Sequence, residues 1–381
     1  MKIYYFDNAA TTKLDDIVFT QMLPFLSENY GNPSSLYKLG TYSKKAIENS
    51  RIKISKIINC KPKELYFTSG GSESDNTALK GIAHANRKKG NHIISSVIEH
   101  PAILESLKVL EKEGFKVTYL PVDRNGIINL NQLEKAITPN TILISIMFAN
   151  NEIGTIEPIA QIGKIAKQKN VFFHTDAVQA AGALSLDVNE LGVDALSISA
   201  HKFYGPKGIG CLYVKDDVPF ESLISGGHQE REKRAGTENV ASIVGMSIAL
   251  ENVYQNLEEH NLHLKELRDY FLSTILKRFP DIKINGSITN RLPGNINISF
   301  KNLNRKRILD ELDKLGICAS AGSACSAGIL QQSHVLNAIG IPKEYSNNSL
   351  RITIGKYNTK EEVDYLITSL SNIVTQLYKE S

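Results

Sequence analysis

The strongest constraint on the fold is a regular alternation of short apolar segments with longer amphipathic segments between residues 64 and 214. The apolar segments are typical of buried strands, which are expected at 64–68, 92–97, 116–120, 141–148, 171–176 and 196–199. The segments between them predict helices at about 76–89, 101–113, 130–137 and 159–169. This alternation predicts an α/β fold with a mainly parallel sheet covered on both faces. A further strand at 211–214 is expected to return antiparallel.

A second, smaller α/β unit is expected after two long helices at about 240–257 and 260–279. Its predicted elements are strands at 295–300 and 349–354, a helix at 305–315 and a final helix from residue 360. No low-complexity linker or internal repeat separates the two halves. We expect a large domain at 15–257 and a small domain formed by 1–14 and 258–381.

The composition is that of an ordinary globular protein and argues against nucleic acids and membranes as partners. The net charge is only +4, and no basic block with interleaved aromatic residues marks a nucleic-acid surface. No signal peptide and no apolar run of about 18 residues is present. We therefore expect a cytoplasmic protein that binds neither nucleic acid nor a membrane.

Lys202 is the candidate nucleophile, because it follows the expected strand 196–199 and precedes a turn rich in glycine and proline. An amine at a strand end loses its proton through desolvation or a nearby charge and then condenses with an aldehyde. A lysine that merely ends a strand is the alternative. Asp176, at the end of another apolar strand, favours the first interpretation, because a pyridine nitrogen needs such a carboxylate to stay protonated.

Polar residues also follow other expected strands, at the edge of a parallel sheet where ligands bind. These are His100, residues 150–152, and Gln179 with Asp176. A lone histidine is more often structural, but several polar clusters at equivalent strand ends favour a binding site. The turn 69–76, with two glycines before a helix, predicts a phosphate cradle, although any tight strand-to-helix connection could use such glycines.

The four cysteines have no paired spacing, which argues against a disulfide framework or a zinc site. Residues 318–328 are almost all small, so we expect a flexible loop with an exposed Cys325. Cys60, Cys211 and Cys318 adjoin apolar segments and are expected to be buried. A disordered loop with an incidental thiol is the alternative for Cys325.

Taken together, these residues resemble the cysteine desulfurases, which are pyridoxal-phosphate enzymes of the class V aminotransferase group. The similarity runs nearly end to end, and its motifs are residues 7–12, 68–76, 150–154, 201–208, 234–237 and 322–325. The resemblance implies the transferase fold of the aspartate aminotransferase type. Residues 226–228 and 330–332 depart from the usual family pattern, with His228 in place of a third glycine.

The resemblance also implies roles for individual residues. Lys202 would bind the aldehyde of pyridoxal 5'-phosphate, Asp176 its pyridinium nitrogen, and His100 would stack on its ring. The other implied cofactor contacts are Gly71, Ser72, Ser199 and His201 at the phosphate, Gln179 at the phenolic oxygen, Asn151, and Thr237 from the partner subunit of a homodimer. Asn151 and Arg351 would fix the substrate carboxylate, since an arginine fork orients a planar carboxylate.

The activity implied by the resemblance is removal of sulfur from L-cysteine, with Lys202, His100 and Cys325 as catalytic residues. L-alanine would be one product, and a persulfide on Cys325 would be passed to an acceptor protein for iron–sulfur cluster assembly or tRNA thiolation. A selenocysteine lyase or another pyridoxal-phosphate enzyme of class V is the enzymatic alternative. A scaffold that only binds sulfur-transfer partners is the non-enzymatic alternative.

Overall fold

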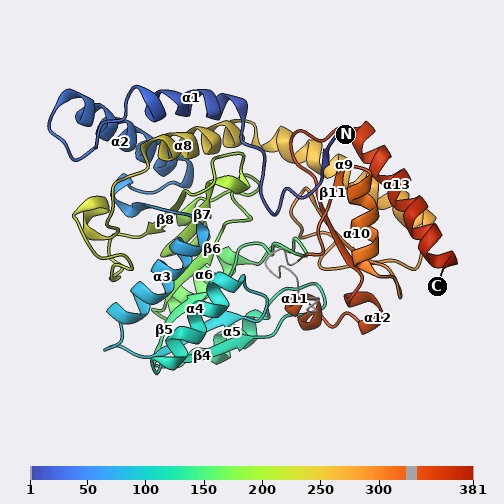
Figure 1. Ribbon diagram of the computed structural model, residues 1–381. Coiled ribbons are helices and arrows are strands. Elements are labelled where there is room, and N and C mark those ends of the chain that lie inside the picture. Colours follow the sequence, from blue (N-terminus) through green and yellow to red (C-terminus); the bar gives the residue numbers. More distant parts are fainter. Residues whose placement is uncertain (1, 323–332, 381) are drawn as a thin grey trace.

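The centre of the molecule is a seven-stranded sheet, seen in a computed structural model that describes residues 2–322 and 333–380 (Figure 1). Its strands, in the order in which they lie side by side, are β2 (Leu65–Thr68), β8 (Gly210–Val214), β7 (Ala195–Ser199), β6 (Phe172–Asp176), β5 (Thr141–Ser145), β3 (His92–Ser96) and β4 (Lys116–Leu120). Neighbours from β7 to β4 are parallel, and β8 runs antiparallel to both β7 and β2. The predicted mainly parallel sheet and the antiparallel return are confirmed.

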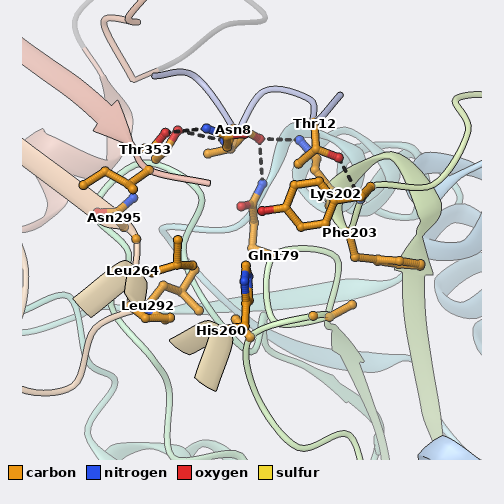
Figure 2. Close-up of a pocket in the computed structure, with 18 residues that line it drawn as sticks. Asn8, Thr12, Gln179, Lys202, Phe203, His260, Leu264, Leu292, Asn295 and Thr353 are labelled. Atoms are coloured by element: carbon orange, nitrogen blue, oxygen red, sulfur yellow. Dashed lines mark hydrogen bonds between the residues drawn. The ribbon is translucent and has the colours of Figure 1, made fainter. Parts of the chain in front are cut away.

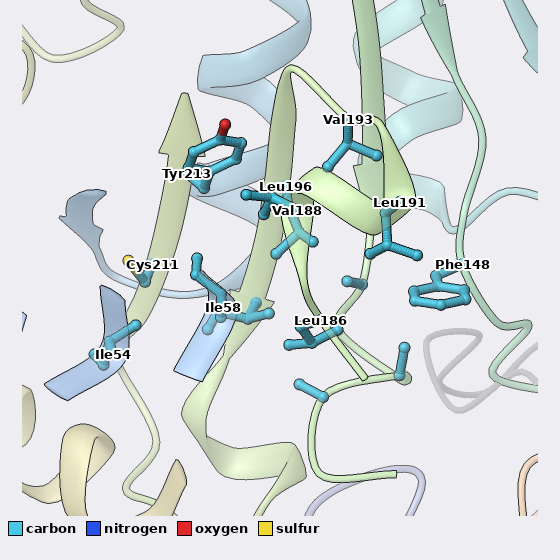
Figure 3. Packing of buried hydrophobic residues seen from close by; sticks show 14 of the residues in the cluster. Ile54, Ile58, Phe148, Leu186, Val188, Leu191, Val193, Leu196, Cys211 and Tyr213 are labelled. Carbon is cyan, nitrogen blue, oxygen red and sulfur yellow. The ribbon is translucent and has the colours of Figure 1, made fainter. Parts of the chain in front are cut away.

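Two layers of helices cover the sheet, because side chains along each strand alternate between its faces. On β8, Leu212 and Val214 pack with α3 (Gly71–Ala85) and α4 (Pro101–Lys112). Cys211 and Tyr213 belong to the cluster on the opposite face, where Figure 3 shows them beside Ile54 and Ile58. The helices of that second layer are α2 (Lys38–Ile58), α6 (Ile159–Gln168) and α8 (Val240–Gln255).

The C-terminal part of the chain forms a second, antiparallel sheet of three strands, in the order β12 (Ser349–Thr353), β10 (Asn295–Ser299) and β9 (Lys283–Ile284). Its main helices are α9 (Leu257–Arg278), α10 (Arg305–Lys314) and α13 (Lys360–Lys379), whose apolar side chains share one buried cluster with those strands. The N-terminus joins this unit, since β1 (Tyr4–Tyr5) pairs with β11 (Ile317–Cys318). The exact domain limits stay a prediction.

The remaining elements are short or peripheral. They are α1 (Asp16–Ser27), α5 (Leu130–Ala136), α7 (Val188–Leu191), α11 (His334–Ala338), α12 (Lys343–Ser346) and the 3₁₀ turns Pro62–Glu64, Ala200–Lys202 and Gln229–Glu232. The expected strand 141–148 runs three residues past β5. Ile146 and Phe148 still donate backbone hydrogen bonds to His174 and Asp176 of β6, which explains why the apolar pattern continues.

Two details differ from or add to the expectations from sequence. Cys211 is buried as expected, but Cys60 and Cys318 are only partly buried, because each lies just beyond the apolar segment that it adjoins. Within the described ranges, no helix has the length and apolar character needed to cross a membrane.

Candidate active site

A cavity of about 530 Å³ opens at the carboxyl ends of the parallel strands. Small-molecule sites commonly have volumes of roughly 300–1,000 Å³, so the cavity is large enough for a cofactor with a substrate. All but two of the residues that the sequence analysis singled out line this one cavity. They are Gly71, Ser72, His100, Asn151, Asp176, Gln179, Ser199, His201, Lys202 and Arg351.

The two exceptions are Thr237 and Cys325. Thr237 is exposed and lines a different depression, together with Arg234 and Gly236. The guanidinium of Arg234 pairs with the carboxylate of Glu73 on α3 at 2.9 Å, one residue after Ser72 of the main cavity. Cys325 lies outside the described residues.

Lys202 is positioned by the 3₁₀ turn that follows β7. Its Nζ donates hydrogen bonds to the backbone carbonyl oxygens of Ala9 and, at 2.9 Å, Ala10. The N-terminal segment therefore lies directly against the amine, although it is about 190 residues away in the sequence. Residues 7–12 were named as a motif of the family resemblance, but the contact of this segment with Lys202 was not predicted.

A smaller cavity of about 80 Å³ lies beside the main one and shares Ala9, Gln179 and Lys202 with it (Figure 2). Figure 2 shows the side chain of Gln179 directed at the N-terminal segment. Its Nε2 donates to the carbonyl oxygen of Ala9 at 3.0 Å. Gln179 and Lys202 are thus both held by the same short stretch of backbone.

The turn between β2 and α3 provides backbone N–H groups at one end of the cavity. A Cβ atom at position 71 would lie 2.7 Å from Val178 Cγ2 and 3.6 Å from Ser199 Cβ, so only glycine fits there without a shift. The first N–H groups of a helix have no partner within the helix and attract anions. Ser72, Ser199 and His201 line the same cavity and add side-chain donors for an anionic group.

Asp176 lies buried at the end of β6. Its Oδ1 accepts a hydrogen bond from the backbone N–H of Val178 at 2.9 Å. Burial raises the pKa of this carboxyl, whereas the nearby His100 and Lys202 act to lower it. A buried carboxyl of this kind is stabilised as an anion by a cationic group in the cavity.

A second buried carboxyl in the cavity wall, Asp75, was missed by the sequence analysis. It lies one helical turn after Gly71, and this spacing of four residues on α3 is the signal that places both on one face. Its Oδ1 has no hydrogen-bond partner within the described part of the chain. The nearest cationic candidate is His174 at 3.7 Å, but burial lowers the pKa of that imidazole to about 3, so the ring is neutral.

His100 caps the N-terminus of α4, and its Nδ1 accepts a hydrogen bond from the backbone N–H of Ala102 at 3.1 Å. Burial lowers the pKa of the imidazole below its ordinary value. A neutral ring whose Nδ1 accepts carries its proton on Nε2. His100 is therefore a donor at Nε2. A second histidine in the cavity wall, His334, was not predicted, because no strand or motif precedes it.

Arg351 comes from β12 of the C-terminal sheet and reaches the same cavity. Its Nη1 donates to the carbonyl oxygens of Asn151 at 3.0 Å and Gly322 at 2.8 Å, and its Nη2 donates to Asp7 Oδ1 at 2.8 Å. The side chain is only 2% exposed. The cavity is consequently built from both sheets, with the amine on one and the guanidinium on the other.

Comparisons with known proteins agree with this arrangement. Residues 4–366 match the family model described as aminotransferase class-V. The chain is 52% identical to cysteine desulfurase IscS of Clostridium botulinum (strain Hall), over 98% of this chain and 95% of that protein. It is 50% identical to cysteine desulfurase IscS of Methanosarcina thermophila, over 99% and 93% respectively. A solved structure titled NifS-like protein superimposes with a TM-score of 0.93 at 40% identity, covering 99% of this chain and all of that one.

Proposed function

The chain belongs to the aminotransferase class-V family, and from this premise we propose that it is a cysteine desulfurase, which takes sulfur from L-cysteine and releases L-alanine. The observation that carries the proposal is the presence of Lys202, Asp176 and Arg351 in one cavity. An amine, a buried carboxyl and a guanidinium are the groups needed for an aldehyde cofactor, its pyridine ring and an amino-acid carboxylate. The identity of the curated relatives over nearly the whole chain supports the same reaction.

The residues present fit pyridoxal 5'-phosphate, the cofactor of this family. Gly71, Ser72, Ser199 and His201 offer backbone and side-chain donors for its phosphate, and a Cβ atom at position 71 would collide with Val178 beside them. The buried carboxyl of Asp176 would hold the pyridine nitrogen. His100 would lie against the ring, and Gln179 and Asn151 would contact its polar substituents. When bound, the cofactor supplies an aldehyde for amines and a ring that withdraws electrons from the substrate α-carbon.

Lys202 both anchors the cofactor and moves a proton. The carbonyl oxygens of Ala9 and Ala10 orient its Nζ within the cavity. With the cofactor and substrate bound, Nζ would be in position to accept the α-proton of cysteine and to return it to the α-carbon. The two backbone acceptors keep Nζ from swinging away between these steps.

His100 acts as a proton donor, since its neutral ring carries hydrogen on Nε2. The hydrogen bond from Ala102 to Nδ1 and the burial of the ring both favour this form. We propose that Nε2 of His100 donates a proton to the β-carbon from which sulfur has left, rather than accepting the proton of the substrate thiol. Lys202 moves the α-proton, and His100 supplies the β-proton that completes L-alanine.

Arg351 and Asn151 fix the substrate carboxylate. Asn151 also accepts a hydrogen bond from Arg351 through its backbone oxygen, which couples the two residues. Selenocysteine would make the same contacts. Arg351 and Asn151 therefore recognise the amino-acid carboxylate and do not distinguish sulfur from selenium.

Sulfur then passes to Cys325. A sulfur–sulfur bond forms between the Cys325 thiolate and the substrate sulfur while the carbon–sulfur bond breaks, so that cysteine and a thiol become alanine and a persulfide. The persulfide is then handed to an acceptor protein. A homodimer, in which Thr237 reaches the cofactor of the partner subunit, completes the proposal.

Replacement of Lys202 by alanine tests the function directly. We expect Lys202→Ala to lose at least about a thousandfold in alanine formation, because both the anchor and the proton carrier are gone. Added cofactor should also no longer give the absorbance near about 420 nm that a lysine-bound aldehyde produces. Lys164→Ala, at an exposed position of α6, is the control and should keep both signals. Full turnover in Lys202→Ala would contradict the assignment.

A further inference from the structure

The guanidinium of Arg351 has five N–H groups, and three of them are already used. Nη1 donates both of its hydrogens, to the carbonyl oxygens of Asn151 and Gly322. Nη2 donates one hydrogen to the carboxylate of Asp7. Nε is buried and has no acceptor among the residues that the structure describes. Nε–H and the second hydrogen of Nη2 therefore remain available as donors to a ligand.

Nε and Nη2 lie on the same edge of the guanidinium, which is the edge that can bind a carboxylate as a fork. In a planar guanidinium, Nε–H and one N–H of Nη2 point in parallel from the same edge, which matches the two oxygens of a carboxylate. The buried, unpartnered Nε is thus what a bound carboxylate would satisfy. A substrate carboxylate at this fork would share Nη2 with Asp7.

Asp7 holds a fixed negative charge next to that fork. Its Oδ1 lies 2.8 Å from Nη2, and its backbone oxygen accepts a hydrogen bond from the hydroxyl of Tyr5 at 3.1 Å. The other carboxyl near Arg351 is that of Glu152, which accepts a hydrogen bond from Ser333 and whose pKa is raised by burial. Among the residues described, Asp7 is the carboxylate in ion-pair contact with Arg351.

We propose that Asp7 acts through Arg351 and lowers the affinity of its guanidinium for the amino-acid carboxylate. This inference rests on the proposed function, in which Arg351 binds the carboxylate of cysteine. Two carbonyl oxygens and the burial of the side chain keep Arg351 in place without Asp7. The net effect of Asp7 is therefore its charge, which repels a second carboxylate at the same guanidinium.

The weakening serves product release. L-alanine keeps the same carboxylate and amine as L-cysteine, so every contact that binds the substrate through these groups also binds the product. A lower affinity for the carboxylate shortens the time that alanine occupies the cavity. Asp7 should therefore affect substrate and product by the same factor.

The test compares two ligands that differ only in the carboxylate, L-alanine and ethylamine, on the holoenzyme by titration calorimetry. Asp7→Asn removes the charge and keeps an oxygen that accepts from Nη2. We expect it to bind alanine about tenfold more tightly than the wild type, with ethylamine unchanged. The KM for cysteine and the inhibition constant of alanine should fall together.

Asp7→Ser removes the same charge with a smaller side chain. If Asp7→Asn does not fold, Asp7→Ser still gives the direction of the change in alanine affinity. Asp16→Asn, which removes an exposed carboxylate paired with Lys13, is the matched control and should leave alanine binding unaltered. Unchanged or weaker alanine binding in the Asp7 variants, or equal tightening of both ligands, would overturn the inference. A wild type that binds alanine no better than ethylamine would instead count against the carboxylate site itself.

Discussion

Glu99, next to His100 of the site, is a buried carboxyl that makes the stability of the protein depend on pH. Its carboxyl accepts a hydrogen bond from Ser96 at 2.6 Å and from the backbone N–H of Met147. Burial nevertheless raises its pKa from 4.5 to about 8. Between these two pH values the folded protein holds a proton on Glu99 that the unfolded chain releases. The contribution of this proton to the free energy of unfolding is therefore complete below pH 4.5 and is lost as pH rises toward 8.

Glu99→Gln should remove that pH dependence, because an amide holds no such proton. The free energy of unfolding of the wild type relative to Glu99→Gln should fall by roughly 4 kcal/mol between about pH 4.5 and pH 8. Urea unfolding across this range, at one protein concentration, gives the difference. Glu105→Gln, an exposed residue of α4, serves as control. Parallel curves for the wild type and Glu99→Gln would refute the assignment.

At the scale of residues, the apolar pattern found the groups at strand ends, the family resemblance added Arg351, and the backbone contacts between distant segments were missed. Asp176 and Lys202 follow apolar strands, so their place at the sheet edge is predictable. The contact of Asp7 with Arg351 joins positions 344 residues apart, and no local pattern encodes it. The carbonyl groups of Ala9 and Ala10 carry no side-chain signal at all.

At the scale of elements, the turn from β2 into α3 connects sequence most directly to function. Gly70 has φ +153° and precedes the first helical residue, Gly71, whose missing Cβ leaves room beside Val178. A methyl group there would push α3 away from Val178 and Ser199. The N–H groups of the first helical turn would then move relative to the cavity.

Gly71→Ala should therefore bind the cofactor more weakly, by about tenfold or more, without loss of fold. Titration of the apoprotein with pyridoxal 5'-phosphate, followed by absorbance, measures the affinity, and circular dichroism checks the fold. Lys80→Ala, in the middle of the same helix, is the control. An affinity equal to that of the wild type would show that the glycine is not needed for the approach of the cofactor.

The longer elements were predictable and several short ones were not. The strands β3, β5, β7 and β8 are buried along their whole length, and the flanking helices have a regular apolar spacing. By contrast, β1, β9 and β11 have two residues each, and α7 has four. Such short pieces are held by their tertiary partners, so their own sequences contain too few residues to show a period.

At the scale of the whole molecule, the position of Thr237 outside the main cavity is what a role at a partner subunit requires. Thr237 is exposed on the segment that follows the turn Gln229–Glu232. That turn contains three consecutive residues with positive φ, Glu230, Arg231 and Glu232, and Glu230 is fixed by a buried ion pair with Arg51 at 2.7 Å. The turn is thus rigidly tied to α2, which keeps Thr237 at the surface.

Mixing two inactive variants tests whether the site is shared between subunits. If Thr237 reaches the cofactor of the partner, a dimer of one Lys202→Ala chain and one Thr237→Val chain contains one complete site. A mixture that has been dissociated and reassociated should recover about a quarter of the wild-type sites. Thr41→Val, at an exposed position of α2, should behave as wild type in the same assay. No recovery, with mixed dimers demonstrated by mass, would place Thr237 in the site of its own chain.

The transfer of sulfur from cysteine to Cys325 is the central claim, and mass spectrometry of the protein after incubation with L-cysteine tests it most directly. We predict a gain of about 32 Da, one sulfur atom, on the peptide that contains Cys325, together with an equal amount of L-alanine in solution. Cys325→Ala should bind the cofactor and show no such gain. Alanine formed at the wild-type rate by Cys325→Ala, or added sulfur found on another cysteine instead, would contradict the account.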